Sequence, residues 1–160
     1  MSEEKILTQE GFDKLQEEYD NLTTVRRKEY AEHLKEARSY GDLSENAEYD
    51  AAKDEQAAVE MRIAELEEIL RGAKVVDEKK RKKNRIDVGT EITVEYTNLH
   101  GKKVKKDFKI VGSAESDPIE GKLSNESPVG FALMGAKEGQ TVDVQLPERI
   151  VKYKVLKIKK

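Results

Sequence analysis

The feature that most constrains this chain is a long stretch, from Gln9 to Leu70, that contains no proline. Its only glycines are Gly11 and Gly41, and glutamate, lysine, arginine, alanine and leucine, all good helix formers, dominate it. Apolar side chains recur at spacings of three and four on both sides of Gly41, which is the period of helices that pack along a seam. The stretch therefore predicts an antiparallel hairpin of two long helices, which reverses direction near Gly41.

The two predicted helices differ in regularity. Thr8 is placed to cap the first helix. That helix begins with a heptad stripe and then changes to spacings of four, a stutter that would locally unwind the supercoil, at Arg26, Tyr30, Leu34 and Ala37. The second helix keeps its alternation without a break from Tyr49 to Ala73. At ~1.5 Å per residue, arms of this length span about 45 Å. So long and thin a rod is expected to dimerise, to act as a spacer, or to place its tip where a globular domain cannot reach.

The predicted turn places two carboxylates at the end of the rod. Asp42 and Glu45 are three residues apart, so at the start of a helix they share one side. Paired hard oxygen ligands are what Mg²⁺ takes from a protein when its other ligands come from elsewhere. The same Asp-x-x-Glu spacing is also that of a capping box, and the spacing leaves both interpretations open. An exposed Leu43 between the carboxylates is unusual for a simple cap and suggests a tip that inserts into a partner.

Charge divides the chain into two parts. Residues 1–78 hold 22 acidic and 11 basic side chains, whereas residues 79–160 hold 11 acidic and 19 basic ones. The basic half is expected to face a polyanion or an acidic protein, or its lysines simply keep a small domain soluble. The run from Lys79 to Arg85 is either a contact for a nucleic-acid backbone or a solvated linker, and it contains no aromatic residue for base stacking.

From Asp87 onward the apolar period changes to two, which is typical of half-buried strands. Alternation around Ile92, Phe108, Val144 and Tyr153 predicts an antiparallel sheet. Ser127 and Pro128 start a short helix that Gly135 ends, with Phe131, Leu133 and Met134 expected in its buried core. The fold class is therefore α+β: an antiparallel two-helix coiled-coil hairpin followed by a β-sheet domain with a short helix.

Several function classes are excluded. The chain has no cysteine, so it has no disulfide framework, thiolate zinc site or cysteine nucleophile. The β-rich half shows no glycine-rich phosphate loop and no nucleophile–base pair. The chain has no secretory signal and no apolar run long enough to span a membrane, so a cytoplasmic protein is expected.

Two segments resemble a known family. The tip ARSYGDLSENAEYDAAK, residues 37–53, closely resembles the coiled-coil tip of the bacterial GreA/GreB transcript cleavage factors, and its DLSEN is more similar to the GreA branch. The segment SPVGFALMG, residues 127–135, resembles the C-terminal domain of the same family. The resemblance extends over essentially the whole chain. It implies an FKBP-like C-terminal domain at the rim of the RNA polymerase secondary channel and a hairpin inside that channel.

The resemblance also implies roles for individual residues. Asp42 and Glu45 correspond to the carboxylates that help the polymerase hold a second catalytic Mg²⁺, so that the polymerase itself cleaves backtracked RNA. Arg38 and Lys53 are the expected contacts for the RNA 3′ end. The expected polymerase contacts are Leu43, Ser44, Asn46, Ser127 and Pro128. The protein alone is then not an enzyme, binds Mg²⁺ only weakly and acts as a monomer.

The expected domain limits are residues 1–76 for the hairpin, with its tip at 40–47, then a basic linker at 77–86 and the FKBP-like domain at 87–160. Three alternatives remain beside the cleavage-factor interpretation. One is a channel-binding modulator of RNA polymerase without cleavage stimulation. The others are a prolyl isomerase with a helical arm and a self-associating coiled coil.

Overall fold

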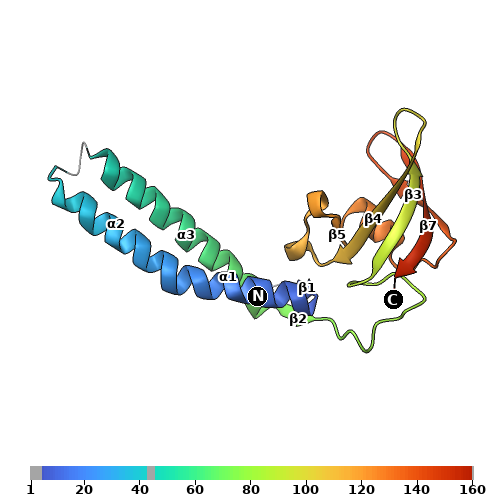
Figure 1. The fold of residues 1–160 in the computed structure, drawn as a ribbon, viewed down its shortest axis with the longest axis horizontal. Helices are drawn as coiled ribbons and strands as arrows, with labels where there is room; N and C mark the ends of the chain where they lie inside the picture. The colour runs from blue at the N-terminus through green and yellow to red at the C-terminus, as the bar shows by residue number, and fades with distance from the viewer. Residues whose placement is uncertain (1–4, 43–45, 160) are drawn as a thin grey trace. The chain divides into compact units, whose positions relative to one another are not determined.

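The computed structural model describes residues 5–42 and 46–159 (Figure 1). Within them the chain forms two compact units, one of residues 12–72 and the other of residues 5–11 together with 73–159. The first unit is helical and the second is built around a β-sheet. No helix of the described residues is both long and apolar enough to cross a membrane.

The helical unit is the predicted hairpin. Its outgoing arm consists of α1 (Gln9–Asn21), the π-helical turn η1 (Leu22–Arg26) and α2 (Arg27–Ser39). Its return arm is the single helix α3 (Ala47–Arg71), which runs beside the outgoing arm in Figure 1. Thr8 caps α1 as predicted, because its hydroxyl accepts a hydrogen bond from the Gly11 amide at 3.0 Å.

The break in the heptad pattern falls at the π-helical turn. The Arg27 amide donates to the Leu22 carbonyl, five residues back, so this turn holds one more residue than an α-helical turn. The hydroxyls of Thr23 and Thr24 donate to the carbonyls of Tyr19 and Asp20, at 2.9 and 2.6 Å. Such bonds compete with the α-helical ladder, which gives a local reason for the wide turn.

The seam of the hairpin is narrow. One packed cluster of buried side chains comes from α2 and α3, namely Tyr30, Leu34, Ala52, Val59 and Ile63, and Leu15, Ala37 and Leu66 are buried as well. The predicted return helix was too long at its end. It stops at Arg71 with Gly72 as its C-cap, and Ala73 begins a strand instead.

That strand is β2 (Ala73–Val75), and it pairs in parallel with β1 (Lys5–Leu7). The sequence predicted neither strand, because three residues are too few to show a period of two. The pairing joins the segment that precedes the hairpin to the segment that follows it, and both segments belong to the β unit. Residues 5–11 and 73–86 belong to the compact β unit.

The β unit contains a five-stranded sheet in the order β5-β4-β3-β7-β6. The strands are β3 (Glu91–Thr97), β4 (Lys103–Val111), β5 (Lys122–Ser124), β6 (Thr141–Gln145) and β7 (Ile150–Lys159). All pairings are antiparallel, as predicted, except that the unpredicted β5 runs parallel to β4. Two single-turn helices, η3 (Ser113–Glu115) and η4 (Pro118–Glu120), lie between β4 and β5.

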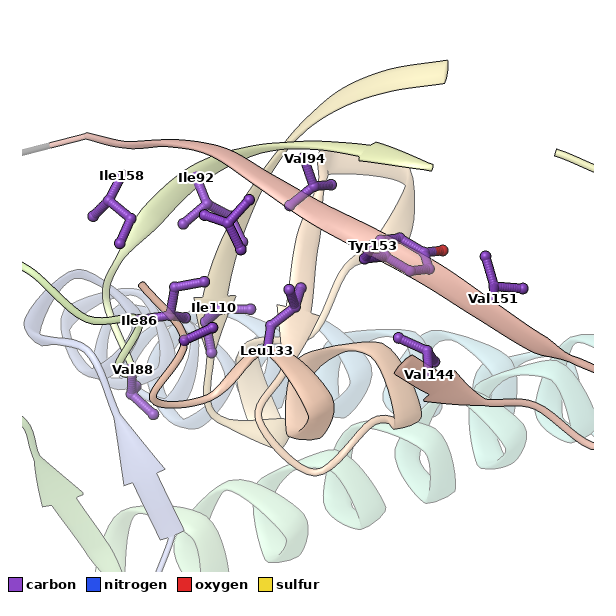
Figure 2. Packing of buried hydrophobic residues seen from close by; sticks show 12 residues of the cluster. Ile86, Val88, Ile92, Val94, Ile110, Leu133, Val144, Val151, Tyr153 and Ile158 are labelled. Carbon is purple, nitrogen blue, oxygen red and sulfur yellow. The ribbon is translucent and has the colours of Figure 1, made fainter. Parts of the chain in front are cut away.

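One face of the sheet is covered by the short helix α4 (Pro128–Leu133). Figure 2 shows Leu133 of this helix lying among core side chains of the sheet, including Ile110 and Val144, and all three are fully buried. The prediction that Phe131 joins this core was wrong, because Phe131 is 74% exposed. Residues two apart on a helix differ by about 200°, so a buried Leu133 turns Phe131 away from the sheet.

Candidate functional site

The candidate site is the connection between α2 and α3, at the far end of the hairpin unit (Figure 1). The structure describes residues 40–42 and 46 of this connection, and the predicted site residues Leu43, Ser44 and Glu45 lie outside the described residues. Gly41 has φ +101°, in the left-handed region that favours glycine. Asp42 follows it and is exposed. The predicted turn glycine thus brings an acidic side chain to the surface of the tip.

Asn46 fastens the start of the return helix. Its side-chain oxygen accepts a hydrogen bond from the Tyr49 amide at 3.1 Å, and its side-chain nitrogen donates to the Ala37 carbonyl at 2.6 Å. One side chain therefore caps α3 and ties it to the last turn of α2. Helix α3 begins at Ala47 and its N-cap is Asn46, whereas the predicted capping pair of Asp42 with Glu45 includes a residue that lies outside the described residues.

The Asp42 carboxylate suits Mg²⁺ by its chemistry, since this ion prefers hard oxygen ligands. Over residues 5–42 and 46–159, no three acidic or histidine side chains gather closely enough to hold a metal ion. Any ion bound at Asp42 would therefore need ligands from outside this part of the chain.

A hollow of about 270 Å³ lies between the helices close to the tip. His33 Nδ1 and Glu55 Oε2 lie 2.7 Å apart across it, and the Tyr40 hydroxyl donates to Glu36 at 3.0 Å. The hydrogen bond to Glu55 raises the pKa of His33, and the bond to Glu36 raises the pKa of Tyr40. The surface of α2 and α3 next to the tip is therefore acidic, and it carries one histidine that is readily protonated.

Arg38 and Lys53, the predicted RNA contacts, are both exposed. Arg38 lies in the last turn of α2, and Lys53 lies in the second turn of α3, where its Nζ donates to Gln56 at 2.9 Å. Each arm of the hairpin thus presents one cation within two helical turns of the tip connection.

Ser127 and Pro128, predicted as polymerase contacts, start α4. The Ser127 hydroxyl accepts from the Gly130 amide at 3.1 Å and donates to the Ser124 carbonyl at 2.6 Å. A Cβ at Gly130 would lie 1.9 Å from that same carbonyl oxygen, so only glycine fits there. The cap holds α4 against the chain and leaves the aromatic ring of Phe131 exposed. Sequence reasoning missed this surface ring, although its two-residue separation from Leu133 was a signal for it.

Comparison with known proteins identifies the family. Residues 5–75 match the family model described as transcription elongation factor, N-terminal, and residues 81–160 match the model described as transcription elongation factor, GreA/GreB, C-term. These matches cover most of the chain, so the chain belongs to the GreA/GreB family of transcription elongation factors.

Curated relatives agree with this assignment over their whole length. Transcription elongation factor GreA of Thermoanaerobacter pseudethanolicus is 50% identical over 160 residues, which is 100% of both chains. The protein of the same name from Clostridioides difficile is 48% identical over 99% of this chain and 98% of its own. Among solved structures, GreA factor homolog 1 (Gfh1) of Thermus thermophilus is 27% identical, with a TM-score of 0.45 over 98% of this chain and 99% of its own. The sequence identity, rather than the superposition, carries the assignment.

Proposed function

We propose that this chain inserts the tip of its helical hairpin into the secondary channel of bacterial RNA polymerase and stimulates the polymerase to cleave backtracked RNA, which rescues arrested complexes. The observation that supports this most directly is the exposed Asp42 at the hairpin turn. Asn46 caps the return helix, and Asp42 presents a carboxylate at the surface of the turn that precedes it.

Mg²⁺ would be held jointly by Asp42, by Glu45 and by ligands of the polymerase. When bound, this ion stabilises the attacking and leaving oxygens of an in-line phosphoryl displacement. In this proposal the role of the chain is to supply carboxylate ligands that the polymerase itself lacks. Arg38 and Lys53 are positioned to neutralise phosphates of the RNA 3′ end, which would hold the scissile bond near the tip.

The hairpin provides the reach that this role requires. Helix α3 has 25 residues, which at ~1.5 Å per residue correspond to about 38 Å. Ion pairs join the two arms along their length, among them Arg62 with Glu18 at 2.7 Å and Arg27 with Glu60 at 3.1 Å. Ion pairs at several levels therefore hold the two arms side by side as one rod.

In this proposal the tip residues Leu43, Ser44 and Asn46 contact the walls of the channel, and the β unit contacts its rim through Ser127 and Pro128. The exposed Phe131, one helical turn from Ser127, adds a ring that a protein partner would cover. The partners are thus the polymerase and the 3′ end of its backtracked RNA, and the chain acts as a cytoplasmic monomer.

The test uses RNA polymerase halted in a backtracked complex with end-labelled RNA and Mg²⁺. Wild type should release a 3′ fragment rapidly, and Asp42→Asn and Glu45→Gln should each lower the rate by at least ~100-fold, because each removes a ligand charge. Asp50→Asn is the matched control, since Asp50 is an exposed acid in the first turn of α3. This variant should stimulate cleavage as well as the wild type does.

Circular dichroism and competition against the wild type verify that each variant folds and still enters the channel. Loss of cleavage with retained competition supports a metal-positioning tip. Equal cleavage by the tip variants would reject the proposal. If wild type competes for the channel but never cleaves, the chain is a binding-only modulator of the polymerase.

A further inference from the structure

Asn46 uses both polar atoms of its side chain within the hairpin. Its Oδ1 accepts from the Tyr49 amide at 3.1 Å, and its Nδ2 donates to the Ala37 carbonyl at 2.6 Å. Its backbone carbonyl accepts from the Asp50 amide at 3.2 Å, so the residue also opens the hydrogen-bond ladder of α3. The side chain is half-buried. We call the bond from Asn46 Nδ2 to the Ala37 carbonyl the clip, because it joins the two arms where they enter the turn.

A cap for α3 does not require the clip. The Tyr49 amide needs only an acceptor at position 46, and serine or aspartate supplies one about as well as asparagine does. Asparagine adds a donor beside that acceptor, whereas a carboxylate has no N–H and a serine hydroxyl is one bond shorter. The donor is spent on the last turn of the opposite arm. The choice of asparagine at this position therefore serves the clip as well as the cap.

Packing fixes the groups on both sides of the clip. Ala37 is 2% exposed near the C-terminal end of α2, and its carbonyl also accepts from the Tyr40 amide at 3.2 Å. Both lone pairs of this carbonyl are thus used. On the other arm, Tyr49 packs against the buried cluster of the seam. The clip therefore connects two places that the rest of the hairpin already holds, and a bond between held groups fixes their separation.

The clip closes the base of the turn that carries the predicted metal ligands. It joins two residues that are nine positions apart in the chain, and Asp42 lies between them. On the α2 side the Gly41 amide donates to the Arg38 carbonyl at 3.3 Å, so the residue before Asp42 is held as well. On the α3 side Glu45 is the neighbour of Asn46 in the sequence. Closing a short loop at its base lowers its conformational entropy, which restricts where its side chains can lie.

We propose that Asn46 is a positioning residue for transcript cleavage, which acts through the clip to hold the tip carboxylates in the spacing that a shared Mg²⁺ requires. This inference rests on the proposed function, since it names a further residue for the same reaction. Mg²⁺ demands near-ideal octahedral geometry with ligands at about 2.1 Å, so a turn that opens at its base binds the ion less well. A misplacement of ~1 Å can lower a rate on the order of 100-fold. Asn46 does not touch the ion but acts through Asp42 and Glu45.

The test compares Asn46→Ser and Asn46→Asp with the wild type on RNA polymerase halted in a backtracked complex. Both variants keep an acceptor for the cap and lose the clip, so hydrogen exchange of the Tyr49 amide should stay as slow as in the wild type. At saturating protein the cleavage rate should fall ~10-fold or more, and half-maximal cleavage should need more Mg²⁺. The concentration that competes for the channel should not change. His33→Gln is the matched control, because it removes the contact between the arms one helical turn further from the tip, to Glu55 at 2.7 Å, and it should cleave as the wild type does.

Spin labels give a second readout that needs no polymerase. The chain has no cysteine, so Lys35→Cys with Asp50→Cys places one label at an exposed position on each arm. Electron paramagnetic resonance should show a wider spread of label distances in Asn46→Ser, and the wild-type spread in His33→Gln. Wild-type cleavage by either Asn46 variant, or an unchanged spread of distances, would overturn the inference and leave the proposed function intact. A wild type that does not stimulate cleavage would reject the proposed function, and this inference with it.

Discussion

The two units are held together in different ways. In the β unit, side chains from several strands and α4 are completely buried, and Ile92, Val94, Ile110 and Leu133 have 0% exposure. In the hairpin unit most buried residues keep some contact with water, as with 2% exposure at Ile63 and 9% at Tyr30, and among the described residues of this unit Leu66 alone has 0% exposure. A sheet covered by a helix surrounds its core side chains on all sides, whereas two paired helices bury side chains only along the line where they touch. The hairpin must therefore draw more of its stability from polar contacts between its arms.

Those contacts are present along the hairpin. Glu55 of α3 joins both His33, at 2.7 Å, and Arg26, at 3.5 Å. The Tyr19 hydroxyl donates to Glu67 at 3.1 Å, and this bond raises the pKa of Tyr19. Exposed pairs of this kind each contribute little, because water screens them, and they weaken further with salt. The comparison implies that salt, pH and single charge changes act on the hairpin more than on the β unit.

Core truncations should give the largest difference between the units. Leu133→Ala removes a fully buried side chain of the β unit and is expected to cost 2–5 kcal/mol of its unfolding free energy. Leu34→Ala in the seam, where Leu34 is 8% exposed, should fall at the lower end of that range. Urea unfolding followed by NMR signals of backbone amides measures both, with amides of α3 for the hairpin and amides of β3 for the β unit. Equal costs would contradict the distinction between an enclosed centre and an open seam.

Removal of a helix cap should have an intermediate effect. Asn46→Ala deletes the cap of α3 and the bond to the Ala37 carbonyl, which should cost ~0.5–2 kcal/mol of hairpin stability. Ser127→Ala deletes the matching cap of α4 in the β unit. Hydrogen exchange of the first α3 amides should accelerate in Asn46→Ala and stay unchanged in Ser127→Ala. Unchanged exchange in both would mean that packing alone sets the start of α3.

The smallest effect expected is a pH dependence confined to the hairpin. Because Glu55 raises the pKa of His33 above 6.5, the charged pair stabilises the hairpin below that pH, and the contribution disappears as the pH rises through the raised pKa. The hairpin should thus melt at a slightly lower temperature at pH 8 than at pH 6. His33→Gln should remove this difference, and His100→Gln, in the β3–β4 turn, should not. If the difference in melting temperature between pH 6 and pH 8 persists in His33→Gln, other titrating groups cause it.

Much of the fold follows from the sequence because its elements are periodic. The spacings of three and four fix the two arms, and alternation around Ile92, Val144 and Tyr153 fixes three of the long strands. The caps at Thr8 and Ser127 were also predictable, since a cap depends on the three residues that follow it. The candidate site was located in the same way, because Gly41 interrupts the helix pattern once and Asp42 follows directly.

The tertiary structure decided those features of the fold that no periodic pattern in the local sequence indicates. Strands β1 and β2 have three residues each and exist because distant parts of the chain pair, and that pairing turns Ala73 from a helix position into a strand position. Asn46 caps α3 and its side-chain amide also reaches the Ala37 carbonyl across the turn, a contact between the arms that no local pattern shows. Local periodicity specifies each element, whereas long-range pairing and packing decide where elements end and which side chains meet.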